Sequence, residues 1–171
     1  MVEMANELTL KRTFDAPREL VFKAWTDPEL ISRWWGPTGF TTPISEVEAR
    51  KGGKLHIVMH GPKGSDFDLD MPVRGVFQEF DPPRRLVFTN DALHDDDGNP
   101  QLATLCTVTL VEQGGKTEMT LHIVLVKTTP ASAAAWAGAE MGWSQSLDKL
   151  TTLVASPKSQ PAKSKSYLAA R

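Results

Sequence analysis

The segment from Phe14 to Pro37 constrains the fold of this chain more than any other part of the sequence. Pro17 and Pro28 each stand where a helix can begin, because the first helical turn does not use the N–H that proline lacks. Asp27 precedes Pro28 and can cap the second helix, and Gly36-Pro37 ends it. The segment therefore predicts two short helices joined by a tight corner.

Each of these two helices has an apolar face to bury. Asp15 or Ala16 can cap the first helix. The apolar residues at helical spacing are Leu20, Val21, Ala24 and Trp25 in the first helix and Leu30, Ile31, Trp34 and Trp35 in the second. Both helices are therefore expected to pack against a core.

Most of the remaining chain up to Lys127 alternates between apolar and polar residues, which indicates β-strands. The expected strands are Leu8–Phe14, Phe40–Ala49, Lys54–His60, Met71–Phe80, Arg85–Asn90, Leu102–Glu112 and Thr117–Lys127, with a loop at His94–Pro100. Gly114 and Gly115 tolerate the positive φ angles of a tight turn, so the last two strands form a hairpin. This hairpin has one apolar and one polar face, as expected when one side of an antiparallel sheet is covered.

One long helix is expected to supply the cover, from a cap at Thr129 and Pro130 in its first turn to about Ala155. The residues that fall near one line along it are Trp136, Glu140, Trp143, Leu147, Leu150 and Val154. This stripe should lie along the sheet. The sequence therefore predicts an α+β fold in which a curved antiparallel sheet of about seven strands wraps a long C-terminal helix.

Composition indicates one domain with an ordinary surface. With 171 residues and 40% hydrophobic content the chain can bury one sizeable core, which we expect within residues 1–155. Residues 156–171 are basic, contain prolines and have little apolar surface, so a disordered tail is expected. The net charge of −2 gives no reason to expect nucleic acid as a partner, and no apolar run suggests a membrane span. The single Cys106 excludes an internal disulfide and no leader is recognised, so we expect a cytoplasmic location.

Several short motifs, taken in order, resemble a known family. They are Phe14–Pro37, Gly52-Gly53, Val58–Pro62, Arg74–Phe77 with Asp81–Phe88, and Gly142–Leu150. Together they resemble the START-like helix-grip superfamily, and within it the domain similar to the C-terminal part of the heat-shock-protein ATPase activator. The resemblance covers about Leu8 to Val154. It implies a ligand-holding cavity between the sheet and the C-terminal helix, and it brings no universal catalytic residue.

Neither a metal site nor a nucleophile is predicted, and no cofactor is expected. His56 and His60 are separated along one expected strand by about 13 Å, which is too far to share one ion. The loop Asp95–Asn99 imitates the start of a calcium site but lacks the glycine and the glutamate that such a site needs. Cys106 has no adjacent base and lies among inward apolar positions, so it should behave as a small hydrophobe.

Glu140 is the polar residue that needs an explanation, because it interrupts the apolar stripe of the long helix. An ionised carboxylate at a buried position is costly unless it is paired, hydrogen-bonded or facing water. Two interpretations stay open. Glu140 either reaches the helix edge or pairs with Arg74, or it orients a ligand or acts as an acid or base in the cavity.

The expected ligand cavity is lined mainly by aromatic and aliphatic side chains. Trp34, Trp35 and Phe40 flank the Gly-Pro turn, where their rings can line a cavity mouth. Trp25 and Trp143 are expected in the core, because helical spacing onto a sheet explains them. The candidate lining residues are Trp34, Trp35, Phe40, Ile57, Met59, Val73, Phe77, Phe88, Cys106, Trp136, Glu140 and Trp143.

Three functions remain open from the sequence. The first, which we favour, is a non-catalytic protein that binds an unidentified small hydrophobic or amphipathic ligand. The second is an enzyme similar to a cyclase or dehydratase that uses Glu140 as acid or base, because the wider superfamily includes polyketide cyclases. The third is a co-chaperone-like interaction module, whose partner is a chaperone or a second copy of the chain in a homodimer.

Overall fold

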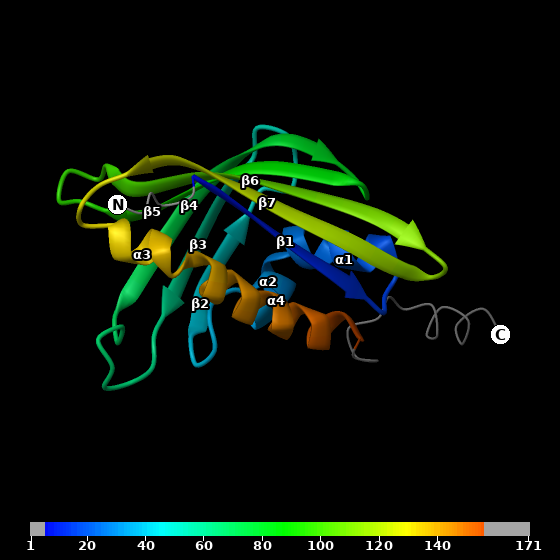
Figure 1. Cartoon of the computed structure of the whole chain (residues 1–171), viewed down its shortest axis with the longest axis horizontal. Helices are drawn as coiled ribbons and strands as arrows, with labels where there is room; N and C mark the ends of the chain where they lie inside the picture. The colour runs from blue at the N-terminus through cyan, green and yellow to red at the C-terminus, as the bar shows by residue number, and fades with distance from the viewer. Residues whose placement is uncertain (1–5, 156–171) are drawn as a thin grey trace.

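The computed structural model describes residues 6–155, and the tail predicted at 156–171 lies outside the described residues. In chain order the elements are β1 (Glu7–Phe14), α1 (Arg18–Thr26), α2 (Pro28–Trp34), β2 (Thr41–Val47), β3 (Lys54–His60), β4 (Asp70–Asp81), β5 (Arg85–His94), β6 (Pro100–Gln113), β7 (Lys116–Thr128), α3 (Ala133–Ala137) and α4 (Ala139–Ala155). Figure 1 shows the helices within the curve of a single sheet.

The seven strands pair antiparallel in the order β1-β7-β6-β5-β4-β3-β2. The first strand along the chain is thus the neighbour of the last one, and β2 forms the other edge. Inward positions of the central strands are mostly apolar and buried, whereas their outward neighbours are partly exposed. These observations confirm the predicted α+β fold, with a curved antiparallel sheet and two short helices after the first strand.

The corner between β1 and α2 differs from the prediction at its first helix. Pro17 occupies the N-cap position of α1 without a side-chain capping bond, so the prediction of Asp15 or Ala16 as the cap is wrong. Ala16 instead offers its carbonyl oxygen to the hydroxyl of Thr117 on β7, at 2.8 Å. Asp27 is the predicted cap of α2, and its Oδ1 accepts the N–H groups of Glu29 and Leu30 at 2.9 and 3.2 Å.

The C-terminal helix is interrupted, which corrects the prediction of one continuous helix. Gly138 separates α3 from α4, and α3 begins after Ser132, not after Thr129. Glu140 is exposed in the first turn of α4, directly after the break, so its predicted place on the buried stripe is wrong. The other stripe residues do face the interior: Trp136, Leu147, Leu150 and Val154 are buried, and Trp143 is half-buried.

The buried Ser132 fixes the start of α3 on the sheet. Its hydroxyl donates to the carbonyl of Gln101 on β6 at 2.7 Å and accepts the N–H of Thr129 at 2.9 Å. The predicted loop at His94–Pro100 is shorter than expected, because β5 continues to His94 and β6 begins at Pro100. None of the helices in residues 6–155 is long and apolar enough to cross a membrane.

Candidate functional site

Aromatic rings from four elements meet between the sheet and α4, and we call this cluster the aromatic floor. Its members are Trp25 in α1, Trp34 in α2, Trp35 just after α2, Phe88 on β5 and Trp143 on α4. The rings of Trp25 and Trp143 are stacked with centroids 6.0 Å apart, and Trp35 meets Trp143 edge-on at 5.1 Å. Trp25 also lies 6.1 Å from Phe88. These ring contacts pack α1, α2 and α4 against the sheet.

Two neighbouring indoles of the floor differ in their hydrogen bonding. Trp34 donates its Nε1–H to the carbonyl of Ala24 at 2.8 Å, which ties α2 to α1. Trp25 is only 2% exposed, yet its Nε1 has no acceptor within residues 6–155. Buried indole N–H groups usually find a partner. Within residues 6–155 the other buried side-chain polar atoms without a partner are Nε of Arg18, Oδ1 of Asn90 and Nδ1 of His94.

A second unpartnered polar atom faces the same side of the sheet. Asn90 follows Phe88 at the two-residue spacing that keeps both side chains on one face of β5. Its Oδ1 is buried and has no donor within the described part of the chain. Its strand partner is Thr104, whose hydroxyl lies 3.8 Å from the sulfur of Cys106.

The interior carries no formal charge. In residues 6–155 the buried polar side chains are all serines and threonines, without any Asp, Glu, Lys, Arg or His. Burial raises the pKa of the Cys106 thiol to about 12, so this group stays neutral and unreactive near neutral pH. An ionised ligand group placed here would lose its hydration without a countercharge, so the interior suits a neutral guest.

Polar residues of α4 hold the turn that follows α2. Ser146 accepts the N–H of Gly36 at 3.1 Å, and Gln145 accepts the N–H of Thr38 at 3.1 Å. Lys149 donates to the carbonyl of Pro37 at 3.3 Å, and partial burial lowers the pKa of Lys149. The middle of α4 is therefore anchored against the turn that follows α2.

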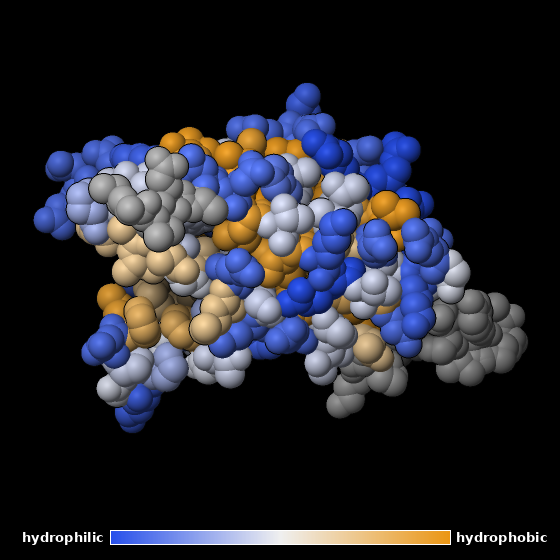
Figure 2. Space-filling model, viewed as in Figure 1, coloured by the Kyte–Doolittle hydropathy of each residue, from blue (hydrophilic) through white to orange (hydrophobic). Residues whose placement is uncertain are grey.

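An apolar rim lies at the α3 end of the helices, where the same Gly-Pro turn meets β3. A Cβ added to Gly36 would lie 3.4 Å from Cβ of Phe40 and 3.5 Å from Sδ of Met59, so these side chains adjoin the turn. Phe40 in turn lies 5.9 Å from Phe67, which is 53% exposed. Figure 2 shows apolar surface around a recess at this end, beneath α3. We call Phe40, Met59 and Phe67 the rim.

The structure distributes the predicted lining residues over three environments. The buried ones are Trp34, Trp35, Ile57, Val73, Phe77, Phe88, Cys106 and Trp136. Phe40, Met59 and Trp143 are half-buried at or near the rim and the floor, whereas Glu140 is exposed. Whether any of them contacts a ligand stays a prediction.

The alternative in which Glu140 pairs with Arg74 is wrong. Arg74 is exposed and follows the buried Val73, so it lies on the outward face of β4. There it lines a shallow hollow of about 440 Å³ together with Lys54, His56 and Asp91. Glu140 belongs to α4, which lies on the other side of the sheet (Figure 1).

Asn90 and Thr104 were missed by the sequence analysis, and Trp25 was assigned to the core alone. A signal for Asn90 was present, because Leu86, Phe88 and Asn90 alternate on the inward face of one strand. No sequence signal marks Trp25, because its missing acceptor depends on the neighbours that the fold brings together. No group of three or more His, Cys, Asp or Glu side chains within residues 6–155 is arranged to hold a metal ion.

Residues 15–155 match the family described as Activator of Hsp90 ATPase homolog 1-like protein. No curated protein matches the chain at a significant level. Similar solved structures include protein CV1439 from Chromobacterium violaceum, which is 27% identical with a TM-score of 0.75 and covers 88% of this chain and 98% of its own. A protein from Arthrobacter aurescens is 26% identical with a TM-score of 0.76 over 90% of this chain and 88% of its own. The AHSA1 protein from Silicibacter pomeroyi is 25% identical with a TM-score of 0.69, and the match covers 87% of this chain and 97% of its own.

Proposed function

Because the chain belongs to the Activator of Hsp90 ATPase homolog 1-like family and has its helix-grip fold, we propose that it binds a small, neutral, amphipathic molecule between the sheet and the C-terminal helices. Membership of this family supports a ligand-binding or co-chaperone-like module. The ligand, its site and the absence of catalysis are parts of the proposal.

The observation that carries the proposal is the unpartnered Nε1–H of Trp25. A buried donor without an acceptor costs about 1–3 kcal/mol, and folding alone does not recover this cost. A guest with a hydrogen-bond acceptor would recover it on binding. The buried Oδ1 of Asn90 also has no donor within the described residues, so we propose that the same guest supplies one.

These two atoms and the aromatic floor define the chemistry of the ligand. The stacked and edge-on rings favour an aromatic or otherwise flat apolar body. The lack of charged groups among the buried residues of the described chain disfavours carboxylates and ammonium groups. We therefore propose a flat, neutral ligand that carries one acceptor and one donor, as an amide or a phenol does.

The test uses a matched set of probes, namely naphthamide, the methyl ketone of naphthalene, naphthalene itself and naphthoate, with binding measured by calorimetry. Naphthamide should bind most tightly and naphthoate most weakly. Trp25→Phe should reduce the advantage of naphthamide over naphthalene by about fivefold, which corresponds to one lost hydrogen bond of about 1 kcal/mol. Asn90→Ala should weaken naphthamide but leave the methyl ketone unchanged.

The matched control is Trp34→Phe, which removes an indole N–H that Ala24 already satisfies. It should lower the stability of the fold without changing the ratio of naphthamide to naphthalene affinity. If the four probes bind equally in the unchanged protein, or none binds, the proposal is wrong.

The two alternatives from the sequence receive unequal support. The hypothesis of an enzyme that uses Glu140 as an acid inside the cavity has no support, because Glu140 is exposed. A co-chaperone-like module keeps some support, since Phe67, Leu69 and Met141 are large apolar side chains that are at least half exposed. Binding of a chaperone that is abolished by Met141→Ser but unaffected by Trp25→Phe would favour this second function.

A further inference from the structure

We propose that the segment 61–69 is a gate at the rim of the ligand site, locked by an ionic clasp of His60 with Asp68 and Asp70, and that the lock releases when His60 loses its proton. This inference rests on the proposed function, because it assigns a control to the same site.

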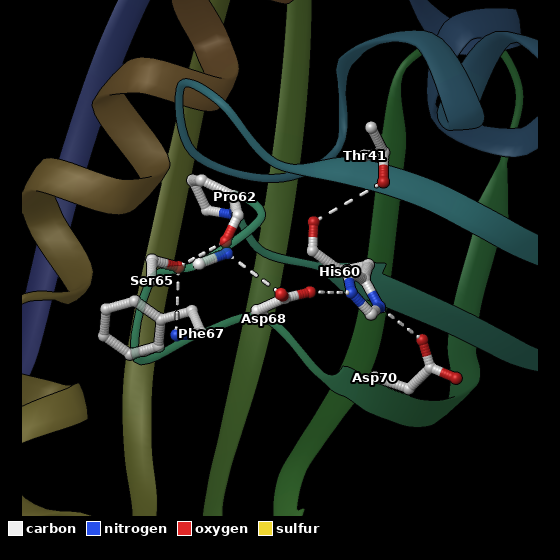
Figure 3. Close-up of polar contacts among 8 residues, drawn as sticks. Thr41, His60, Pro62, Ser65, Phe67, Asp68 and Asp70 are labelled. Atoms are coloured by element: carbon white, nitrogen blue, oxygen red, sulfur yellow. Dashed lines mark hydrogen bonds and ion pairs between the residues drawn. The ribbon is translucent and has the colours of Figure 1, made fainter.

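The clasp engages both nitrogens of one imidazole ring (Figure 3). Nδ1 of His60 lies 2.7 Å from Oδ1 of Asp70, and Nε2 lies 2.8 Å from Oδ1 of Asp68. An ionised carboxylate only accepts hydrogen bonds, and a neutral imidazole has one N–H to give. Only the protonated ring can donate to both carboxylates, so the observed geometry is that of the imidazolium ion.

The clasp closes the loop at both of its ends. His60 is the last residue of β3 and Asp70 is the first residue of β4, and they are partners across these strands. Asp68 reaches back through its other oxygen, Oδ2, and accepts the N–H of Gly64 at 2.9 Å. Loss of the bond between His60 and Asp68 would therefore remove the side-chain tie between His60 and the segment that carries Phe67, while β3 and β4 stay paired.

The backbone of Phe67 is held by Gly61, the residue that follows His60. The N–H of Gly61 donates to the carbonyl of Phe67 at 2.8 Å, and a Cβ on Gly61 would lie only 2.2 Å from that oxygen. Glycine is thus required for the loop to close. The ring of Phe67 points away from the polar cluster (Figure 3) and lies beside Phe40. The locked loop consequently holds one member of the rim in place.

The charged groups around His60 determine how the lock depends on pH. The hydrogen bonds to Asp70 and then Asp68 raise the pKa of His60 above its ordinary value of 6.5. The N–H of Gly64 and then His60 lower the pKa of Asp68. On β2 the partner of His60 is the uncharged Thr41, so within the described chain Asp68 and Asp70 are the ionisable groups that face the ring.

The sign of the pH dependence follows from these shifts. A histidine whose pKa is raised in the folded protein contributes its stabilisation fully below the ordinary pKa and loses it as the pH rises through the raised value. The gate is therefore locked in mildly acid solution and released in alkaline solution. It would also release in strong acid, once Asp68 is protonated.

The lock is tested without any ligand by NMR. The hydrogen-exchange protection factor of the Gly64 amide should fall several-fold as the pH rises through the titration midpoint of His60. His60→Gln should remove this pH dependence and leave Gly64 weakly protected throughout. His56→Gln is the matched control, because His56 lies on the same strand and pairs with Glu46 at 3.0 Å but holds no loop. Equal protection in all three proteins across the titration would overturn the lock.

The gating role is tested by stopped-flow association of naphthamide, which does not ionise in this range. Association should be several-fold faster in alkaline than in mildly acid solution, and uniformly fast in His60→Gln. Rates that are independent of pH and of His60 would overturn the gate even if naphthamide binds. A pH-dependent Gly64 amide in a protein that binds no probe would refute the proposed function and the gating role, but it would leave the lock itself in place.

Discussion

At the scale of single residues, the sheet depends on a glycine where two strands approach closely. A Cβ on Gly75 would lie 1.8 Å from the carbonyl oxygen of Thr89, a distance that no relaxed side chain permits. The hydroxyl of Thr89 also accepts the N–H of Val76 at 2.9 Å, close to the irregular register between β4 and β5. The backbone at Gly75 therefore has no room for a side chain.

Gly75→Ala is expected to destabilise the protein by about 1–3 kcal/mol, because β4 and β5 must move apart to accept the methyl group. The matched control is Gly138→Ala, where the new Cβ would be 3.6 Å from the carbonyl of Ala134 and the φ angle of −92° suits alanine. Urea denaturation of both variants checks the prediction. Similar losses in the two proteins would contradict it.

The residue scale also shows where sequence reasoning succeeds. The inward positions of Phe88 and Cys106 follow from simple alternation, and both are buried. The same alternation includes Asn90 and could have identified it. The exposure of Glu140 could not be predicted, because it depends on a helix break at Gly138 that local propensity does not dictate.

At the scale of elements, the corner after β1 rests on one strong cap. Asp27 satisfies two N–H groups at the start of α2, whereas Asp15 makes no capping bond to α1. Asp27→Ala should therefore cost about 1 kcal/mol of stability, and Asp15→Ala should cost much less. Thermal unfolding of the two variants measures the difference. A larger loss for Asp15→Ala would show that the cap is not what stabilises this corner.

Most elements could be predicted from the sequence because each one has a local signal. Proline and aspartate mark the start of α2, and the two glycines mark the turn between β6 and β7. The interruption of the C-terminal helix has a weaker signal, since glycine inside a helical pattern is often tolerated. Ser132 starts α3 because it can also reach the carbonyl of Gln101, a contact between residues distant in the sequence.

At the scale of the whole molecule, the middle of α4 is fastened to the turn that follows α2, and the rim adjoins the same turn. Ser146→Ala removes the acceptor of the buried Gly36 N–H, so we expect a loss of about 1–3 kcal/mol. Thr152→Ala is the control, because the hydroxyl of Thr152 is exposed on the same helix. Chemical denaturation followed by tryptophan fluorescence checks the prediction. Equal stability of the two variants would argue against this fastening.

The arrangement of the candidate site belongs to this scale and was only partly predictable. Helical and strand periodicity indicate which side chains face inward, and most of the predicted lining residues do so. They do not reveal which inward polar atoms lack partners, because Trp25 and Trp34 occupy similar sequence contexts and only Trp34 meets a carbonyl. Such differences arise from the relative placement of α1, α2 and α4.

The pairing of β1 with β7 has a consequence for how the chain is made. Glu7 lies opposite Val124, so β1 leaves the ribosome long before its partner strand β7 is made. Native contacts that span such long stretches of sequence slow folding, since the entropy of closing the loop is lost before the contacts form. During synthesis the apolar side of β1 and the tryptophan-rich corner behind it have no sheet to cover them, so this surface stays open to aggregation until β7 is made.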